Sequence, residues 1–307
     1  MADQTAPGAQ ASAPDARRRV LVGLIGQGIG PSRTPRMHMA EGRAQGIDLD
    51  YRLIDLAGRD EPLGALLDRL EGEGYDGLNV TYPCKRAVMT HLHALSANAE
   101  AVGAVNTVVF RDGRRFGHNT DHFGFAESFR RGLPDVARDA VLLLGAGGAG
   151  GAVAHALADA GVGRLMILDV DAALARDLAA AVVARHGPGR AEAASDPACA
   201  AQADGIVNAT PVGMAKLPGL PLPEAAIEPR HWVADVVYFP LETALLRAAR
   251  AKGCRVLPGS GMAIFQAARA FRLFTGREAD PDRMRATFES FDAAPNAAPN
   301  AASQGAA

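Results

Sequence analysis

The chain has 307 residues, 48% of them hydrophobic, and a formal net charge of -2 at pH 7. This length allows two domains with ordinary apolar cores, and the charge gives no indication of nucleic acid or an anionic membrane as a partner. The three cysteines, Cys84, Cys199 and Cys254, have neither metal nor redox spacing, so we expect a cytoplasmic protein without a metal site.

The composition of both chain ends predicts disordered tails at residues 1–19 and 291–307, because the first is rich in alanine with scattered proline and the second contains Ala-Ala-Pro-Asn twice. The apolar run that follows three arginines is short and lacks a small-residue cleavage site. It therefore predicts a buried strand at 20–26 rather than a signal peptide. No uninterrupted apolar stretch reaches 18 residues, so no membrane span is expected.

Two hydroxyl side chains follow this strand. Residues 27–35 form a predicted loop that opens into a helix over 36–45, and Ser32 and Thr34 lie two positions apart in the loop. In an extended backbone their side chains would point the same way and could bind a small anion or polyol. Alternatively, one of them caps the helix, with Pro35 in its first turn. The residues alone favour neither interpretation.

Strands and helices then alternate, which predicts a parallel sheet. Strands are expected at 51–55 and 77–81, with a helix at 61–72 between them and a single apolar helix over 87–95 after them. Ligands of open α/β sheets bind at the carboxyl ends of strands. Asn79, Thr81 and Lys85 therefore lie where chemistry is expected.

A hairpin is predicted next, because residues 104–109 and 115–118 have strand character and Asp112-Gly113 is a turn dipeptide. Asp121 follows the hairpin. An aspartate in this position is usually a helix cap, but it could instead pair with Lys85 if the fold brings the two together. A helix from about residue 124 leads into the next strand, which predicts a domain boundary near residue 123.

The second unit begins with an apolar strand at 141–144, a glycine run and a helix. Gly145, Gly147 and Gly150 have the spacing G-x-G-x-x-G, in which the glycines permit the turn, the approach of a pyrophosphate and the packing of helix on strand. The helix N-terminus would attract the phosphates. Asp169 ends the next strand near the position of a ribose-binding carboxylate. It could alternatively cap the following helix, as could Asp171.

The alternation continues to the end of the chain and predicts an α/β protein. Helices are expected over 171–186, 241–251, from about 262 to 273, and over 281–290, and strands over 204–210, 231–238 and 255–257.

Seven segments that carry polar or glycine-rich patterns occur in order: Ser32-Arg33-Thr34-Pro35, Asn79-Val80-Thr81-Tyr82-Pro83-Cys84-Lys85, Gly103-Ala104-Val105-Asn106-Thr107, Gly117-His118-Asn119-Thr120-Asp121, Asn208-Ala209-Thr210-Pro211-Val212-Gly213-Met214, Asp235-Val236-Val237-Tyr238-Phe239-Pro240 and Gly261-Met262-Ala263-Ile264-Phe265-Gln266-Ala267-Ala268. Together they resemble the shikimate/quinate dehydrogenase family over roughly residues 20–290. The resemblance implies two domains with the active site between them. One is an N-terminal mixed, open α/β substrate domain at 20–123, completed by C-terminal helices at 262–290, and the other is a Rossmann dinucleotide-binding domain at 124–261.

The resemblance also implies reversible hydride transfer between nicotinamide and a ring secondary alcohol of shikimate or quinate. Lys85 and Asp121 would handle the hydroxyl proton; because an ordinary lysine is a poor base at neutral pH, their division of labour stays open. The implied substrate ligands are Ser32, Thr34, Thr81, Asn106, Tyr238 and Gln266. The implied cofactor contacts are Gly145, Ala146, Gly147, Gly148, Ala149, Gly150, Asp169, Thr210, Met214 and Gly261, the last lying against the nicotinamide, where a side chain would intrude.

NAD is the implied cofactor, with NADP as the less favoured alternative. Members of the family that prefer NADP usually carry Asn-Arg-Thr after the second strand of the cofactor domain, and the corresponding residues here are Asp169-Val170-Asp171. A carboxylate there would repel a 2′-phosphate and accept hydrogen bonds from a free ribose. Thr34 and the Gly-Gln-Gly-Ile-Gly start of its loop are similar to the NAD-linked, often catabolic quinate/shikimate branch.

Two other functions stay open: an NADP-dependent biosynthetic shikimate dehydrogenase, and a non-catalytic relative that binds the same ligand or NAD. Lys85 and Asp121 argue against the second, because a sensor has no need of a proton-transfer pair. The sequence does not decide between shikimate and quinate. The expected partner is a small-molecule substrate, with no nucleic acid and no membrane, and the chain is expected to be a monomer or a homodimer.

Overall fold

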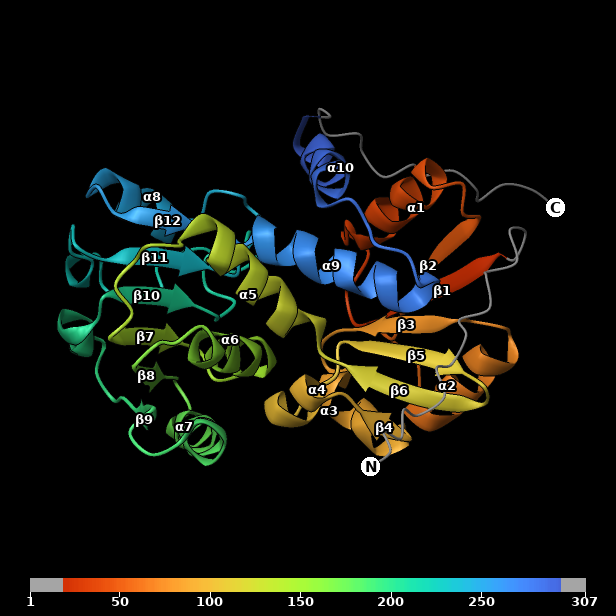
Figure 1. Ribbon diagram of the computed structural model, residues 1–307, viewed down its shortest axis with the longest axis horizontal. Coiled ribbons are helices and arrows are strands. Elements are labelled where there is room, and N and C mark those ends of the chain that lie inside the picture. Colours follow the sequence, from red (N-terminus) through yellow and green to blue (C-terminus); the bar gives the residue numbers. More distant parts are fainter. Residues whose placement is uncertain (1–18, 294–307) are drawn as a thin grey trace, which may run out of the picture.

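Two six-stranded sheets, joined by long helices, make up the computed structural model, which describes residues 19–293 (Figure 1). Of the tails predicted at 1–19 and 291–307, only residue 19 and residues 291–293 are described, and the latter end helix α10 (Pro281–Ala293). Within the described range, no helix combines the length and the apolarity that crossing a bilayer requires.

The first sheet is mixed, as predicted. Its strands are β1 (Val20–Gly26), β2 (Leu49–Asp55), β3 (Gly77–Val80), β4 (Ala94–Leu95), β5 (Thr107–Arg111) and β6 (Arg114–His118). They lie in the order β2-β1-β3-β5-β6-β4, and β5 runs antiparallel to both of its neighbours. The predicted hairpin is confirmed, because Asp112 and Gly113 between β5 and β6 both have positive φ, at 54° and 67°, as a two-residue hairpin turn requires.

The single apolar helix predicted over 87–95 is wrong. The chain there forms four short elements: α3 (Cys84–Ala87), the 3₁₀ turn η1 (Val88–His91), β4, and α4 (Ala97–Val102). Residues Ala94 and Leu95 pair with Phe116 and Gly117 of β6, so distant backbone determines their conformation. A two-residue strand is too short to show a period of its own.

Helix α5 (Thr120–Gly132) begins at Thr120 rather than near residue 124. Asn119 is its N-cap, since the Asn119 side chain accepts a hydrogen bond of 3.1 Å from the His122 backbone N–H. The predicted domain boundary near 123 thus falls inside this helix, and Asp121 lies in its first turn.

The second sheet is entirely parallel. Its strands are β7 (Ala140–Leu144), β8 (Arg164–Leu168), β9 (Ala191–Ala193), β10 (Gly205–Asn208), β11 (Trp232–Asp235) and β12 (Arg255–Leu257), in the order β12-β11-β10-β7-β8-β9. Numbered from β7, this is the order 3-2-1-4-5-6 of the dinucleotide-binding fold. Strand β9 was not predicted. The helical elements of this part of the chain are α6 (Gly148–Asp159), α7 (Ala172–His186), η2 (Pro197–Gln202), η3 (Glu224–Ala226) and α8 (Ala244–Ala251).

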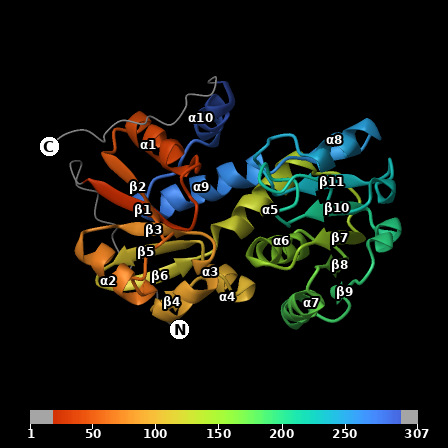
Figure 2. The ribbon, with the colours of Figure 1, turned by 180° about the vertical axis from the view of Figure 1, so that it is seen from behind.

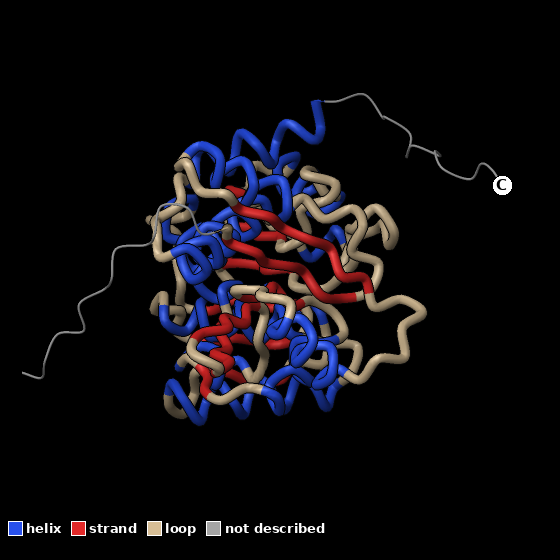
Figure 3. Tube along the Cα trace, turned by 90° about the vertical axis from the view of Figure 1, so that its right-hand side faces the viewer, coloured by secondary structure: helices blue, strands red, loops and turns tan. Residues whose placement is uncertain are grey.

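Helices cover the first sheet on both sides (Figure 3). They are α1 (Thr34–Ala44), α2 (Leu63–Gly72), α9 (Ser260–Thr275) and α10. Buried Ile264, Ala267 and Phe271 of α9 share one core with Val22 and Leu24 of β1. The C-terminal helices thus return to the sheet formed by the N-terminal half of the chain.

Helices α5 and α9 lie side by side between the two sheets in both opposite views (Figures 1 and 2). Two glycines allow them to approach closely. A Cβ added to Gly124 of α5 would lie 2.6 Å from the Met262 carbonyl oxygen, and a Cβ added to Gly261 of α9 would lie 2.2 Å from Ser128 Oγ. The contact between these helices therefore depends on the absence of both side chains.

Candidate active site

The predicted strand, turn and helix of the glycine motif are confirmed at β7 and α6. Gly145 has a φ of +97°, and a Cβ on Gly150 would lie 2.1 Å from the Gly145 carbonyl oxygen, so the turn itself requires both glycines. Gly147 is different: it is the N-cap of α6, and apart from its chain neighbours no atom of residues 19–293 lies within 4 Å of the position its Cβ would take. The space before the helix N-terminus is therefore open, as the binding of a pyrophosphate requires.

Asp169 follows β8 and lies beside this glycine turn. Its Oδ2 accepts a hydrogen bond of 2.6 Å from the Ala146 N–H, and its Oδ1 accepts one of 2.9 Å from the Asp171 N–H. Helix α7 is capped by Asp171, whose side chain accepts from the Ala173 N–H, so the capping alternative applies to Asp171. Each carboxylate oxygen has two lone pairs, which leaves Asp169 with acceptors for ribose hydroxyls.

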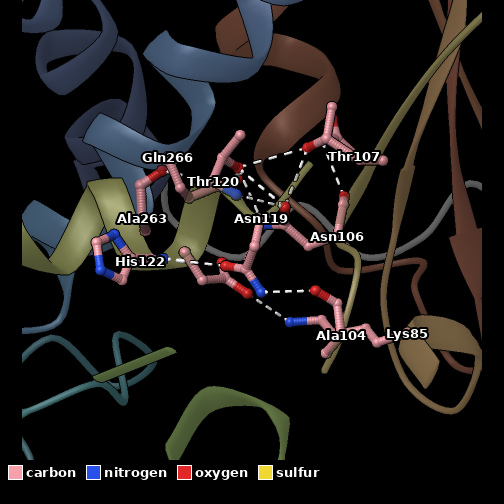
Figure 4. Close-up of polar contacts among 11 residues, drawn as sticks. Lys85, Ala104, Asn106, Thr107, Asn119, Thr120, His122, Ala263 and Gln266 are labelled. Atoms are coloured by element: carbon pink, nitrogen blue, oxygen red, sulfur yellow. Dashed lines mark hydrogen bonds and ion pairs between the residues drawn. The ribbon is translucent and has the colours of Figure 1, made fainter. Parts of the chain in front are cut away.

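Lys85 and Asp121 form an ion pair in which Lys85 Nζ lies 2.6 Å from Asp121 Oδ2. Lys85 is in the short helix after β3, and Asp121 is in the first turn of α5. The Asn119 amide donates to the Ala104 carbonyl oxygen at 3.0 Å, which anchors that turn to the neighbouring segment (Figure 4). The two side chains keep 23% and 12% of their surface exposed, so a substrate can reach the pair.

The ion pair lies at the junction of the two sheets. A Cβ on Gly148, the first residue of α6, would lie 3.7 Å from Lys85 Cδ. The Lys85 side chain therefore runs along the first turn of the helix whose N-terminus faces the open space described above. A cofactor bound there would lie next to the ion pair.

A hydrogen-bonded network next to the ion pair joins three elements (Figure 4). Asn106 accepts a 2.7 Å hydrogen bond from the Thr120 N–H, and its amide donates to Thr120 Oγ1 at 3.0 Å. Thr120 Oγ1 also donates to Gln266 Oε1 of α9 at 3.3 Å. The fold thus brings Asn106 and Gln266 together through Thr120, which sequence reasoning missed although it lies between Asn119 and Asp121 in a family segment.

The two loop hydroxyls do not cap α1. That helix begins at Thr34 with Arg33 as its N-cap, and no side chain completes the cap. Instead, Ser32 Oγ accepts a 3.3 Å hydrogen bond from the Thr34 N–H, and both residues remain half-buried. Thr81 is also half-buried, and its methyl group lies against Gly26, where a Cβ would be only 2.3 Å away.

Tyr238 follows β11 and is 41% exposed. Desolvation raises the Tyr238 pKa, and the charge of Asp121 raises it further, while Lys85 and Arg33 act in the opposite direction. Tyr238 therefore lies within electrostatic reach of the ion pair and of the Ser32–Thr34 loop.

Three predicted cofactor residues have surroundings that the sequence did not indicate. Thr210 Oγ1 donates to Asn208 Oδ1 at 2.6 Å and accepts from the Val212 N–H at 3.2 Å, so it shapes its own loop. Met214 is 41% exposed. At Gly261 the structure adds a steric reason that the sequence did not indicate, because a Cβ there would also collide with Ser128 Oγ of α5.

Asp235, at the end of β11, is a buried carboxylate that the sequence did not single out as a site residue. Burial raises its pKa to about 6, although three hydrogen bonds act against the shift. Asn208 donates to Oδ1, Thr243 donates to Oδ2, and the Val237 N–H donates to Oδ1, at 2.7–2.9 Å. Asp235 therefore fixes both ends of the loop that carries Tyr238.

The strand order and the glycine turn define a two-domain α/β protein with a dinucleotide-binding sheet. Residues 24–108 match the model of the shikimate dehydrogenase substrate binding domain, and residues 259–287 match that of the shikimate 5'-dehydrogenase C-terminal domain. A ThiF family model also matches residues 121–235, which include the strands from β7 to β11.

Among curated proteins, the chain is 56% identical over 272 residues to a shikimate dehydrogenase (NADP(+)) of Streptomyces avermitilis, covering 87% of this chain and 94% of that protein. It is 50% identical over 278 residues to a quinate/shikimate dehydrogenase (NAD(+)) of Corynebacterium efficiens, covering 88% and 98%. Among solved structures, a quinate dehydrogenase from Corynebacterium glutamicum in complex with NAD has a TM-score of 0.85 and 47% identity, covering 89% of this chain and 100% of that chain. The chain belongs to the shikimate dehydrogenase family.

Proposed function

We propose that this chain is an NAD-dependent oxidoreductase that interconverts shikimate, quinate or both with 3-dehydroshikimate or 3-dehydroquinate. The observation that carries this proposal is the Lys85–Asp121 pair beside the first turn of α6. The names of the relatives at 48–56% identity supply the substrate class.

Bound NAD supplies the hydride acceptor in the direction of alcohol oxidation. The protein must then remove the hydroxyl proton, which falls to Lys85 and Asp121. Asp121 Oδ2 accepts from Lys85 Nζ, and Oδ1, which has no hydrogen bond to the described residues, is left to accept from a substrate hydroxyl. The pair fixes the hydroxyl and keeps a proton carrier within hydrogen-bond reach, which serves both proton transfer and orientation.

The remaining residues bind the ends of the substrate. Ser32, Thr34 and Tyr238 are proposed to hold the carboxylate. Thr81, Asn106 and Gln266 are proposed to hold ring hydroxyls. Asn106 and Thr120, which are bonded to each other, are only 4% and 1% exposed, whereas Gln266 at the end of the same network is half-buried.

NAD is proposed to lie along α6 and β8. The backbone of residues 145–150 would face the pyrophosphate, Asp169 would accept from the ribose, and Thr210, Met214 and Gly261 would border the nicotinamide. Val170 is fully exposed where family members that use NADP carry arginine, which leaves a 2′-phosphate without a cation and next to a carboxylate. The NADP-dependent enzyme is the second candidate, because the relative at 56% identity carries that name.

We also propose a substrate domain at residues 20–123, completed by residues 262–290, and a cofactor domain at residues 124–261. We propose that the protein is cytoplasmic, acts in aromatic amino acid biosynthesis or quinate catabolism, and is a monomer or a homodimer. Sedimentation of the purified chain tests the oligomeric state, and growth on quinate of a strain that lacks the protein tests the catabolic role.

Asp121→Asn tests the proposed function directly. The amide keeps the shape but not the charge, so kcat should fall by about 10²–10⁴-fold while the Kd for NAD changes less than about twofold. Asp50→Asn is the matched control, since Asp50 also accepts from arginines in the first domain but lies outside the site, and its kcat should match that of the wild type. Normal turnover of Asp121→Asn would overturn the assignment, and ligand binding without turnover in the wild type would identify a sensor.

A further inference from the structure

Arg33 lies between the two predicted carboxylate ligands Ser32 and Thr34, but its own side chain points to other elements. The residue is 6% exposed. One guanidinium N–H donates to the Phe288 carbonyl oxygen of α10 at 3.0 Å, and the guanidinium carbon lies 4.7 Å from the centre of the Phe288 ring. It also lies 5.5 Å from the centre of the Phe239 ring.

Phe239 belongs to the β11–α8 loop (residues 236–243), which starts from the second sheet. Asp235 anchors both ends of this loop through the Val237 N–H and Thr243 Oγ1. Between these anchors the loop packs on the first domain: Leu241 contacts the core that contains β1 and α9, and the Tyr238 ring meets the Phe288 ring edge-on at 5.8 Å.

The predicted carboxylate site is therefore divided between two parts of the chain. Ser32 and Thr34 come from the loop before α1, and Tyr238 comes from the β11–α8 loop. Arg33 belongs to the first loop and contacts two aromatic rings beside Tyr238: Phe288, which meets the Tyr238 ring, and Phe239, which follows Tyr238. A planar guanidinium can stack on two rings and donate a hydrogen bond at the same time, which an ammonium group cannot reproduce.

We propose that Arg33 is a positioning residue that couples the two halves of the carboxylate site. Through Phe288 and Phe239 it holds the Ser32–Thr34 loop and the β11–α8 loop in a fixed position relative to each other. This inference rests on the proposed function for the identity of the ligand. The contacts of Arg33 do not depend on the identity of the ligand. The geometry predicts that substrate affinity, rather than the chemical step, depends on Arg33.

Steady-state kinetics of Arg33→Lys, Phe239→Leu and the double variant test the coupling. Phe239→Leu removes one of the two stacking contacts and Arg33→Lys removes both. In either variant the KM for shikimate or quinate should rise about tenfold, with kcat and the KM for NAD within about twofold. Because both substitutions break the same link, the double variant should resemble the single ones. Multiplied effects in the double variant, or an unchanged KM in either single one, would overturn the proposal.

Arg36→Lys is the matched control, since Arg36 also stacks on α10, at 4.6 Å from the centre of Phe291. Its KM values should remain those of the wild type. A rise equal to that of Arg33→Lys would show a general loosening of α10, which contradicts a specific role for Arg33.

Amide hydrogen exchange provides a test that does not need turnover, so that a failure of the proposed function leaves this inference testable. Phe239→Leu should speed exchange in residues 27–34 as well as in its own loop, and Arg33→Lys should speed exchange in residues 236–243. Effects confined to the substituted loop would overturn the coupling. A wild type without activity on either acid, together with transmitted exchange, would overturn only the proposed substrate.

Discussion

The second sheet forms its part of the site from residues that are neighbours in the chain, whereas the first sheet assembles its part from distant segments. The glycine turn, its helix and the first strand all lie between Ala140 and Asp159. By contrast, Lys85 and Asp121 are 36 residues apart, and Thr120 and Gln266 are 146 residues apart. The phosphate-binding turn is therefore a local motif, and the proton-transfer side is a product of the whole fold.

This difference has a physical basis. A parallel strand, a tight turn and a helix N-terminus create a phosphate site from backbone groups alone. Moving a proton needs side chains at a fixed separation, and only packing of α5 against α9 and of β3 against β5 sets that separation here. Substitutions in the two regions should therefore impair different properties of the protein.

The largest expected effect is in the glycine turn. Gly150→Ala would put a Cβ 2.1 Å from a backbone oxygen, so we expect about 3 kcal/mol of lost stability and at least about 100-fold weaker NAD binding. Gly147→Ala points into open space but puts alanine at the N-cap of α6, so it should cost no more than about 1 kcal/mol of stability and still lose NAD affinity. Thermal unfolding and NAD titration of both variants measure this contrast, and equal stability losses would contradict it.

A smaller effect is expected at the end of β8. Replacing Asp169 by asparagine and Val170 by arginine removes the charge that repels a 2′-phosphate and supplies a cation on an exposed position. The ratio of kcat/KM for NAD to that for NADP should fall by roughly 100-fold. The Lys85–Asp121 pair is untouched, so kcat with the preferred cofactor should change little. An unchanged ratio would mean that Asp169 serves only the N–H groups of Ala146 and Asp171.

The smallest expected effect is a pH-dependent change in stability that arises in the core of the first domain. His38 is fully buried against Tyr51, Phe271 and Phe274, and neither ring nitrogen has a hydrogen-bond partner among the described residues. Desolvation lowers its pKa from 6.5 to about 3, partly opposed by the charge of Glu41. Between these pH values His38 therefore binds a proton in the unfolded chain but not in the folded protein, so the free energy of unfolding falls as pH decreases from about 6.5 towards 3.

His38→Leu removes this dependence. Relative to the wild type, the variant should gain about 2 kcal/mol of unfolding free energy between pH 8 and pH 5. Denaturant unfolding of both proteins at the two pH values measures the difference. The same difference at both pH values would show that His38 is not the group that titrates.

The sequence predicted the second sheet better than the first for the same reason. The strand at β7, the glycine turn, α6 and the Asp171 cap of α7 are local patterns, and all were confirmed. In the first domain, residues 84–102 were misjudged because β4 exists only through its pairing with β6. The start of α5 was missed even though Asn119 is a recognisable cap.

Residues that act through distant contacts were the least predictable. Nothing in the local pattern around Arg33 indicates that it contacts α10, some 255 residues later in the chain. Gly261 fitted the family segment, but its steric reason became visible only with Ser128 of α5 beside it. Thr120 and Asp235 lie within recognised segments, and the available signal was a polar side chain at or just after the end of a strand.

Initial rates of shikimate and quinate oxidation, each with NAD and with NADP, test the central claim most directly. The absorbance of the reduced cofactor follows all four reactions. The account predicts that at least one acid is oxidised and that NAD gives a far higher rate than NADP, as a carboxylate at Asp169 requires. A preference for NADP would contradict the role of Asp169, and no rate with any pair would contradict the proposed dehydrogenase activity.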